Sequence, residues 1–466
     1  MSQKSRFAKA RRAIIQRQNA RSILNPFAKF LNQQATGGIF LFVFSLIAIA
    51  AVNIPSLQWL HNFWDKDLTL TFNFNASFLP LHTVREWVNS MLMAIFFFFL
   101  CLEIKREMVV ELFSPRSILL PILAAIGGLV VPAAIYFACA AAGGDGAESA
   151  PGWGITTATG LAFTICMLSL LKSRISRGVK VFIISVAIID TLITVIISSI
   201  AYPSHTIYIG FLIAAALIVC LLALLNRFCV NYSFPYFVLG ILLWFFMLRS
   251  GIHAATAGII LALAIPSSIK INQIRFYARS RFMLEKFKEA YNTATPLLKN
   301  EREQEQINNV LREINKVTPL ILRAENAVYP WVHFCIMPIF ALANIGIIIN
   351  AESVGMLTSA TAIGIFLGLV IGKPAGIMLM SFIAVKLKLT SLPEKAQWVE
   401  LLGVSVLAGM GFSMSIFAGT IAFSGIDVAD LQNLGKLAAL IATLFSAVCG
   451  YILIIGACKK HTYRNT

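Results

Sequence analysis

The sequence predicts an all-α, polytopic membrane protein with about twelve transmembrane helices. Its 466 residues are 58% hydrophobic and only 13% charged, and the mean hydropathy is +0.80. An ordinary soluble domain is about 25% charged. Apolar runs of about the length that a hydrocarbon core requires recur along the chain. They lie near residues 37–54, 88–103, 118–140, 154–171, 181–201, 207–225, 234–248, 252–265, 329–349, 359–382, 398–422 and 437–457.

The basic residues predict the orientation of these runs. The net charge of +17 would suggest a nucleic-acid partner in a soluble chain, but Lys and Arg gather between the apolar runs and at the ends. The connections that follow even-numbered runs carry most of them, so the positive-inside rule places both termini in the cytoplasm. We therefore expect no nucleic acid as a partner. The basic arm 1–33 is expected to contact anionic membrane lipid.

The remaining organisation follows the apolar runs. Residues 34–266 hold predicted spans one to eight, and 329–457 hold spans nine to twelve, followed by a cytoplasmic tail, 458–466. Between these blocks, 267–328 is too long for an ordinary link between helices. Its stretches RFYARSRFMLEKFKEAY and REQEQINNVLREINK have helical apolar spacing with charged faces. We expect a cytoplasmic amphipathic helical insertion there.

The first predicted outside loop has a different period. Residues Leu68 to Asn75, LTLTFNFN, alternate apolar and polar side chains, which is typical of a strand. A hairpin near 68–78 would expose a strand edge that can pair with a second copy of the chain. A homodimer formed through this hairpin is one interpretation, and a simple loop is the other.

Neither an enzyme nor a resident metal or cofactor is indicated. The eight cysteines lie within or close to the apolar runs, without a CxxC pair, and are expected to behave as small hydrophobic residues. No cluster of nucleophile, acid and base accompanies the charges in the apolar runs. The sequence therefore predicts no cofactor and no catalytic residue.

Two opposite charges lie deep inside apolar runs. Asp190 is near the middle of VFIISVAIIDTLITVIISSIA, and Lys373 lies within FLGLVIGKPAGIMLM. A lone ionised side chain at this depth costs about 3 kcal/mol on insertion scales, so it normally faces a cavity or a partner charge. We expect Asp190 and Lys373 to form one functional site. A purely structural ion pair is the alternative.

Two apolar runs contain helix-breaking residues. GITTATGLAFTICMLSLL has Thr159 and Gly160 in its middle, and LLGVSVLAGMGFSMSIF has Gly409 and Gly411 at a similar depth. Interrupted membrane helices in corresponding positions of two halves indicate a transporter site, because unwound backbone and half-helix ends can bind ions. Close helix packing is the alternative explanation for each glycine taken alone.

Eight stretches in order along the chain resemble the sodium/proton antiporter A family. They are FFFFLCLEIKRE (96–107), PILAAIGGLVVPAAIY (121–136), GWGITTATGLAF (152–163), AIID (187–190), LRSGIHAATAGIILALAIP (248–266), PWVHFCIMPIFALANIG (330–346), GLVIGKPAGI (368–377) and GMGFSMSIF (409–417). The resemblance implies twelve helices, with spans three to five and ten to twelve as inverted repeats. Spans four and eleven would be the crossed, broken pair. It also implies a bacterial inner membrane.

The resemblance carries roles onto individual residues. Asp190 matches an aspartate of the family's ion site and would bind Na⁺ transiently, Lys373 matches its partner lysine, and Thr159 matches the threonine of the span-four break. Four more residues fall where the family places cytoplasmic-side residues linked to pH response. They are Glu103, Glu107, His253 and Glu325.

Three positions depart from the family's pattern. Thr191 and Gly160 stand where aspartates are expected, and Ser90 replaces an acid at the entry of span two. Because Na⁺ binds carboxylate, carbonyl and hydroxyl oxygens, we expect Asp190 with the Thr191 hydroxyl to bind Na⁺ less tightly than two carboxylates. The predicted function is exchange of Na⁺, or Li⁺, for H⁺ in sodium extrusion and pH homeostasis. The alternative is the same scaffold with another substrate or without transport.

Overall fold

The computed structural model describes residues 34–464, with gaps at 69–81, 111–114, 144–146, 172–174, 202–206, 394–395 and 423–428. Within 268–317 it describes residues 277, 279, 281–283, 285, 304, 305 and 307–311. The described residues are nearly all helical, and the extended pairing among them is one antiparallel bridge between Asp67 and Thr83. The all-α prediction is confirmed.

The principal helices follow the predicted apolar runs in order, and three short helices lie between the runs. Together they are α3 (Gln34–Asn53), α4 (Gln58–Asn62), α5 (Val84–Trp87), α6 (Met93–Val110), α7 (Pro115–Gly143), α8 (Trp153–Thr157), α9 (Leu161–Leu171), α10 (Arg177–Ala201), α11 (Ile209–Arg227), α12 (Ser233–Ser250), α13 (Ala255–Ala264), α16 (Leu320–Trp331), α17 (Met337–Asn344), α18 (Ala351–Gly355), α19 (Ala360–Leu367), α20 (Lys373–Lys386), α21 (Trp398–Ala408), α22 (Phe412–Ala422) and α23 (Ala429–Arg464). Single π-helical turns join α5 to α6, α16 to α17 and α19 to α20.

Among the described residues, nine helices are long and apolar enough to cross a membrane. The number rises to eleven if each of two bent helix pairs is one span. These pairs are Gly37–Asn53 with Pro55–Asn62, bent by 110°, and Trp398–Ala408 with Phe412–Ala422, bent by 48°. Helix α13 is apolar but shorter. A polytopic membrane protein is therefore confirmed, and with α13 as a crossing the order matches the twelve predicted runs.

Some boundaries differ from the prediction. The ninth span begins at Leu320, nine residues before the predicted 329, and ends at Asn344. Its first turns contain charged side chains, so this part of the helix is not a continuous apolar run. Helix α23 continues to Arg464, past the predicted end at 457. The basic arm 1–33, most of the predicted hairpin and most of the predicted insertion lie outside the described residues.

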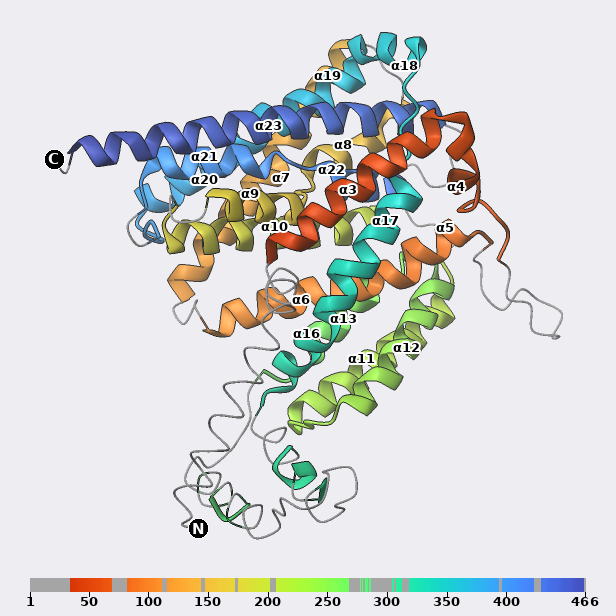
Figure 1. The fold of residues 1–466 in the computed structure, drawn as a ribbon, viewed down its shortest axis with the longest axis vertical. Helices are drawn as coiled ribbons and strands as arrows, with labels where there is room; N and C mark the ends of the chain where they lie inside the picture. The colour runs from red at the N-terminus through yellow and green to blue at the C-terminus, as the bar shows by residue number, and fades with distance from the viewer. Residues whose placement is uncertain are drawn as a thin grey trace, which may run out of the picture.

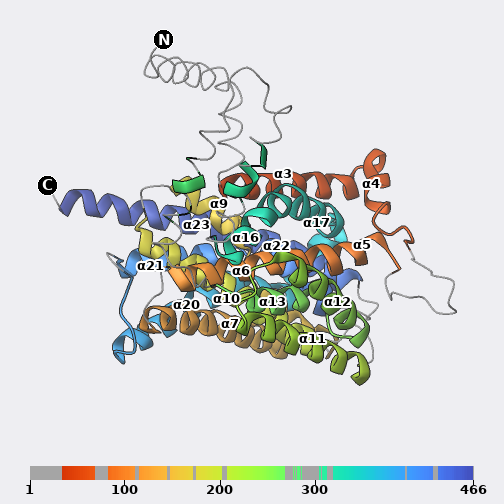
Figure 2. The same ribbon diagram turned by 90° about the horizontal axis from the view of Figure 1, so that it is seen from below.

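The helices pack so that α10 lies inside the bundle. It contacts α7, α9, α21 and α22, and α7 also packs along α20. Helix α23 runs beside α21 across one side of the molecule, whereas α11 and α12 lie side by side at another edge (Figures 1 and 2). Large apolar side chains on α11 and α12, such as Ile209, Phe234 and Phe237, are exposed. That surface is typical of helices that face lipid, while α10 is positioned for an internal site.

Candidate functional site

The first part of the site is the break between α8 and α9. Helix α8 ends at Thr157, α9 begins at Leu161, and the backbone of Ala158 is extended, with φ −77° and ψ 136°. Threonine favours such an interruption because its hydroxyl competes for backbone groups. The Thr157 hydroxyl donates to the Gly154 carbonyl at 3.1 Å. The helix thus stops within the bundle, where its last carbonyls need other donors.

The second part is the break between α21 and α22. The chain leaves helix at Gly409 to Gly411, and α22 begins at Phe412. The Phe412 amide donates to the Thr443 hydroxyl at 3.0 Å. The Ser415 hydroxyl donates to the Ile155 carbonyl of α8 at 2.6 Å. The Ser415 bond ties the second broken helix to the first, and the Phe412 bond ties it to α23.

The two breaks touch each other. The Gly160 amide donates to the Met410 carbonyl at 2.7 Å. A Cβ at Gly160 would lie 2.6 Å from that carbonyl oxygen, and a Cβ at Gly411 would lie 2.8 Å from the Ala158 carbonyl oxygen. Both distances are shorter than van der Waals contact allows. The predicted contact between two broken helices is therefore present, and it depends on glycine at Gly160 and Gly411.

The predicted charge pair lies beside this crossing. Asp190 comes from α10, and Lys373 is the first residue of α20, directly after the π-helical turn Gly368–Gly372. The Lys373 Nζ lies 2.7 Å from Asp190 Oδ2, and both side chains are 0% exposed. An ion pair this deep is stable only when further hydrogen bonds satisfy its remaining atoms.

Threonines of the first break supply these bonds. The Thr159 hydroxyl donates to Asp190 Oδ2 at 2.7 Å, and Lys373 Nζ donates to the Thr157 carbonyl. The lysine therefore neutralises both a carboxylate and the negative end of α8. Asp190 Oδ1 has no hydrogen-bond partner among the described residues. One oxygen of the carboxylate is held in place, and the other is available for a ligand.

Thr191 lies at the edge of the same site. Its hydroxyl is buried, 2.7 Å from the Ala187 carbonyl and 3.2 Å from the Thr159 carbonyl. A hydroxyl has one hydrogen, so it donates to one of these carbonyls at a time and keeps its lone pairs. The structure thus brings Asp190, Lys373, Thr159 and Thr191 together.

The predicted pH-response residues form a separate group, except for His253. Arg106 Nε lies 2.9 Å from Glu325 Oε2, and Arg106 Nη1 lies 2.8 Å from Glu107 Oε1. Glu103 lies one turn earlier on α6 and is 6% exposed. These groups join α6 to α16 at the end of the bundle that is predicted to be cytoplasmic.

His253 lies away from these glutamates. It precedes α13, where Nδ1 accepts a hydrogen bond from the Ala255 amide at 3.3 Å, and its ring meets Phe417 edge-on at 5.3 Å. The opposite end of α13 contacts Lys105, next to Arg106. Helix α13 thus lies between His253 and these glutamates, and a role of His253 in pH response on the cytoplasmic side stays a prediction. Its contact is with α22, one of the broken helices.

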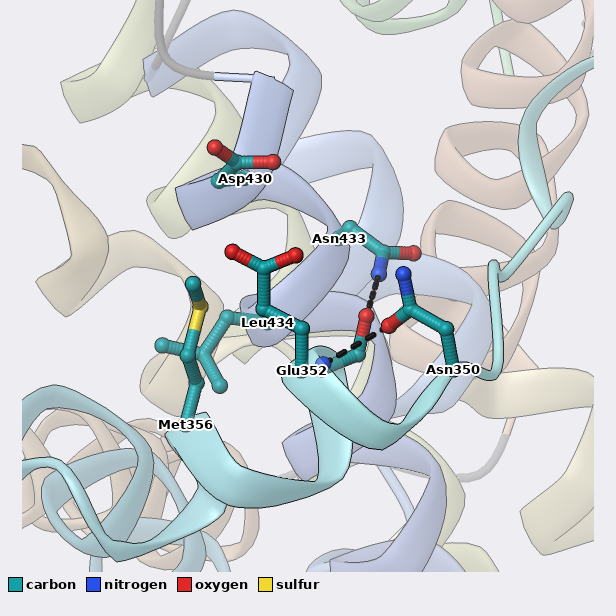
Figure 3. A pocket seen from close by; sticks show the side chains of 7 residues that line it. Asn350, Glu352, Met356, Asp430, Asn433 and Leu434 are labelled. Atoms are coloured by element: carbon teal, nitrogen blue, oxygen red, sulfur yellow. Dashed lines mark hydrogen bonds between the residues drawn. The ribbon is translucent and has the colours of Figure 1, made fainter.

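Other polar features were not predicted from the sequence. Lys105 Nζ donates to the carbonyls of Leu263 and Ile265 at 2.6 and 2.5 Å, which satisfies the C-terminal end of α13. A small pocket of about 30 Å³ lies between α18 and the first turns of α23, lined by Asn350, Glu352, Ser353, Met356, Asp430, Asn433 and Leu434 (Figure 3). Asn433 Nδ2 donates to the Ser353 hydroxyl there at 3.1 Å. No local pattern in the sequence marks these pairings, which join distant segments.

Two broken membrane helices that meet beside a buried ion pair are typical of secondary transporters. A family model described as Na+/H+ antiporter 1 matches residues 28–454. The chain is 37% identical to the Na(+)/H(+) antiporter NhaA of Oleidesulfovibrio alaskensis over 433 residues, which are 93% of this chain and 94% of that protein. It is also 37% identical to the Na(+)/H(+) antiporter NhaA of Pelagibacter ubique over 442 residues, 94% of this chain and 100% of that protein. The chain belongs to the Na+/H+ antiporter 1 family.

Proposed function

We propose that this protein exchanges Na⁺, or Li⁺, for H⁺ across the bacterial inner membrane, and so serves sodium extrusion and pH homeostasis. The observation that carries the proposal is the fully buried Asp190–Lys373 pair, 2.7 Å apart beside the crossed breaks. Family membership supports the same reaction. Asp190 is the cation ligand, and Thr159 fixes the orientation of its carboxylate through the 2.7 Å hydrogen bond.

The exchange follows from competition for one carboxylate. In the proton-loaded state, the Lys373 ammonium neutralises Asp190. When Na⁺ binds Asp190, it takes the place of that positive charge, and Lys373 releases a proton because a second buried cation would be strongly disfavoured. Loss of Na⁺ to the opposite side reverses the steps. Na⁺ and H⁺ therefore occupy the site alternately, which is the requirement for antiport.

Regulation by pH is assigned to the group that joins α6 to α16. Glu103, Glu107 and Glu325 surround Arg106, and a change in their protonation alters the attraction between the two helices. His253 acts at a different place, against Phe417 of α22. We further propose that both termini face the cytoplasm, that the basic arm 1–33 contacts membrane lipid, and that residues near 68–78 form a contact between two copies of the chain.

The proposal is tested in everted membrane vesicles that hold an imposed pH gradient. Addition of Na⁺ to vesicles with the wild-type protein should collapse the gradient, and Asp190→Asn should abolish this response at equal expression. Thr420→Ala is a matched control, since its hydroxyl bonds within its own helix, to the Phe417 carbonyl at 2.7 Å. Unimpaired exchange by Asp190→Asn would refute the assigned site. Absence of exchange by the wild type with Na⁺ or Li⁺ would favour another substrate or loss of transport.

A further inference from the structure

One serine at the second break has a side chain without a visible role in the fold. Ser413, in the first turn of α22, is 0% exposed, and its Oγ has no hydrogen-bond partner among the described residues. Buried polar atoms are normally paired, and an exception needs an explanation. Neighbouring hydroxyls are used: Ser415 Oγ bonds the Ile155 carbonyl, and Thr443 Oγ1 accepts from the Phe412 amide.

The unpartnered Ser413 Oγ lies close to the first break. Its Oγ lies 3.5 Å from the point that a Cβ of Gly160 would occupy. The residue before Gly160 is Thr159, whose hydroxyl holds Asp190 Oδ2. Asp190 Oδ1, also buried, has no partner in the described part of the chain. Two unpartnered oxygens thus flank the short link Thr159–Gly160, one from α10 and one from α22.

A third oxygen, the carbonyl of Ala158, belongs to the residue before this link and approaches the second break. The Ala158 residue has extended backbone, so its carbonyl leaves the helical direction, and this oxygen lies 2.8 Å from the Cβ position of Gly411. Carboxylate, hydroxyl and carbonyl oxygens are the ligands that a hard cation prefers. A carboxylate at position 160 is sterically excluded in this arrangement, because its Cβ would already contact the Met410 carbonyl oxygen.

We propose that Ser413 Oγ is a ligand of the transported Na⁺, which it binds together with Asp190 Oδ1 and the Ala158 carbonyl oxygen. This assignment rests on the proposed function of the site and adds a residue that determines its cation affinity. Ser413 supplies from the opposite broken helix the hard donor that Gly160 cannot supply. The cation then connects α10 to α22, so its release is coupled to the separation of these two helices.

The test measures ²²Na⁺ binding to purified protein in detergent by a scintillation proximity assay, beside exchange in proteoliposomes. Ser413→Ala removes the donor, and Ser413→Cys keeps the shape but offers a soft sulfur that binds Na⁺ poorly. Each should raise the Kd for Na⁺ roughly tenfold, and the KM for exchange should rise similarly. Ser381→Ala is the matched control, because Ser381 is equally buried and unpartnered among the described residues but lies eight positions beyond Lys373.

The outcomes separate the two proposals. A Kd for Ser413→Ala and Ser413→Cys within twofold of the wild type, with Ser381→Ala unchanged, would overturn the role of Ser413. Binding that depends on Ser413 without any exchange would support the ligand and overturn the transport function. Absence of Na⁺ binding by the wild type would overturn both. Melting curves confirm folding of each variant, and Ser413→Cys keeps the test decisive if Ser413→Ala does not fold.

Discussion

Removal of the Lys373 charge should destabilise the folded protein measurably. In Lys373→Met the side-chain volume is nearly kept, but Asp190 loses the ammonium at 2.7 Å and the Thr157 carbonyl loses its donor. At an effective dielectric constant of about 20, the attraction at this distance is about 6 kcal/mol. Desolvation of both charges offsets part of it, and breaking a buried pair typically costs about 3–5 kcal/mol.

The assay is thermal unfolding in detergent. An unfolding entropy of about 2.1 cal/mol/K per residue gives roughly 1 kcal/mol/K for a chain of this length. The expected decrease in Tm is therefore about 3–5 °C. The double variant Asp190→Asn with Lys373→Met leaves no unpaired charge, so it should recover most of this loss. A Tm of Lys373→Met equal to that of the wild type would refute the reasoning. A decrease in Tm of the double variant equal to the sum of the decreases of the two single variants would refute it as well.

Three further changes have defined outcomes. Thr191→Asp places a second carboxylate beside that of Asp190. The KM for Na⁺ in ²²Na⁺ exchange should fall, and the exchange rate should depend more steeply on pH. Unchanged kinetics would show that the second carboxylate does not reach the cation. Gly160→Ala puts a Cβ 2.6 Å from the Met410 carbonyl oxygen and should cost about 1–3 kcal/mol in thermal unfolding. Gly210→Ala, in α11 with no atom within 4 Å of the added Cβ, should not destabilise the protein, because alanine is favoured over glycine in a helix. Equal melting temperatures of Gly160→Ala and Gly210→Ala would argue against the close contact between Gly160 and the Met410 carbonyl. Lys105→Met leaves carbonyls of α13 unpaired and should cost about 1–3 kcal/mol in the same assay; no loss would mean that water replaces the lysine.

Local patterns were sufficient to predict the helices and the two breaks. Continuous apolar sequence identifies membrane spans, and glycine or threonine within such a run marks where a helix stops. The charged first turns of α16 interrupt the apolar pattern. The pattern therefore predicts a start at 329, nine residues after the observed start at Leu320. A search for apolar runs fails where charged side chains lie on one face of a helix that continues into the bilayer.

The site was predictable where a residue type is unusual for its surroundings. Asp190 and Lys373 are conspicuous because charges are rare in apolar runs. Ser413 stands beside the glycines of the second break, but its residue type does not mark it as a ligand, because a serine in a membrane helix usually bonds its own backbone. Its free hydroxyl depends on how α22 meets the α8–α9 break, which is a long-range contact. The separation of His253 from the glutamates likewise follows from the direction of α13 and has no local signal.

The central claim is that Na⁺ and H⁺ compete for the Asp190–Lys373 pair. The most direct test is calorimetric titration of purified protein with Na⁺, in buffers that differ in ionisation enthalpy. Because Na⁺ takes the place of the Lys373 proton, binding should release about one proton per Na⁺, and Asp190→Asn should show neither binding nor release. Tight Na⁺ binding without proton release, or equal proton release by Asp190→Asn, would contradict the claim.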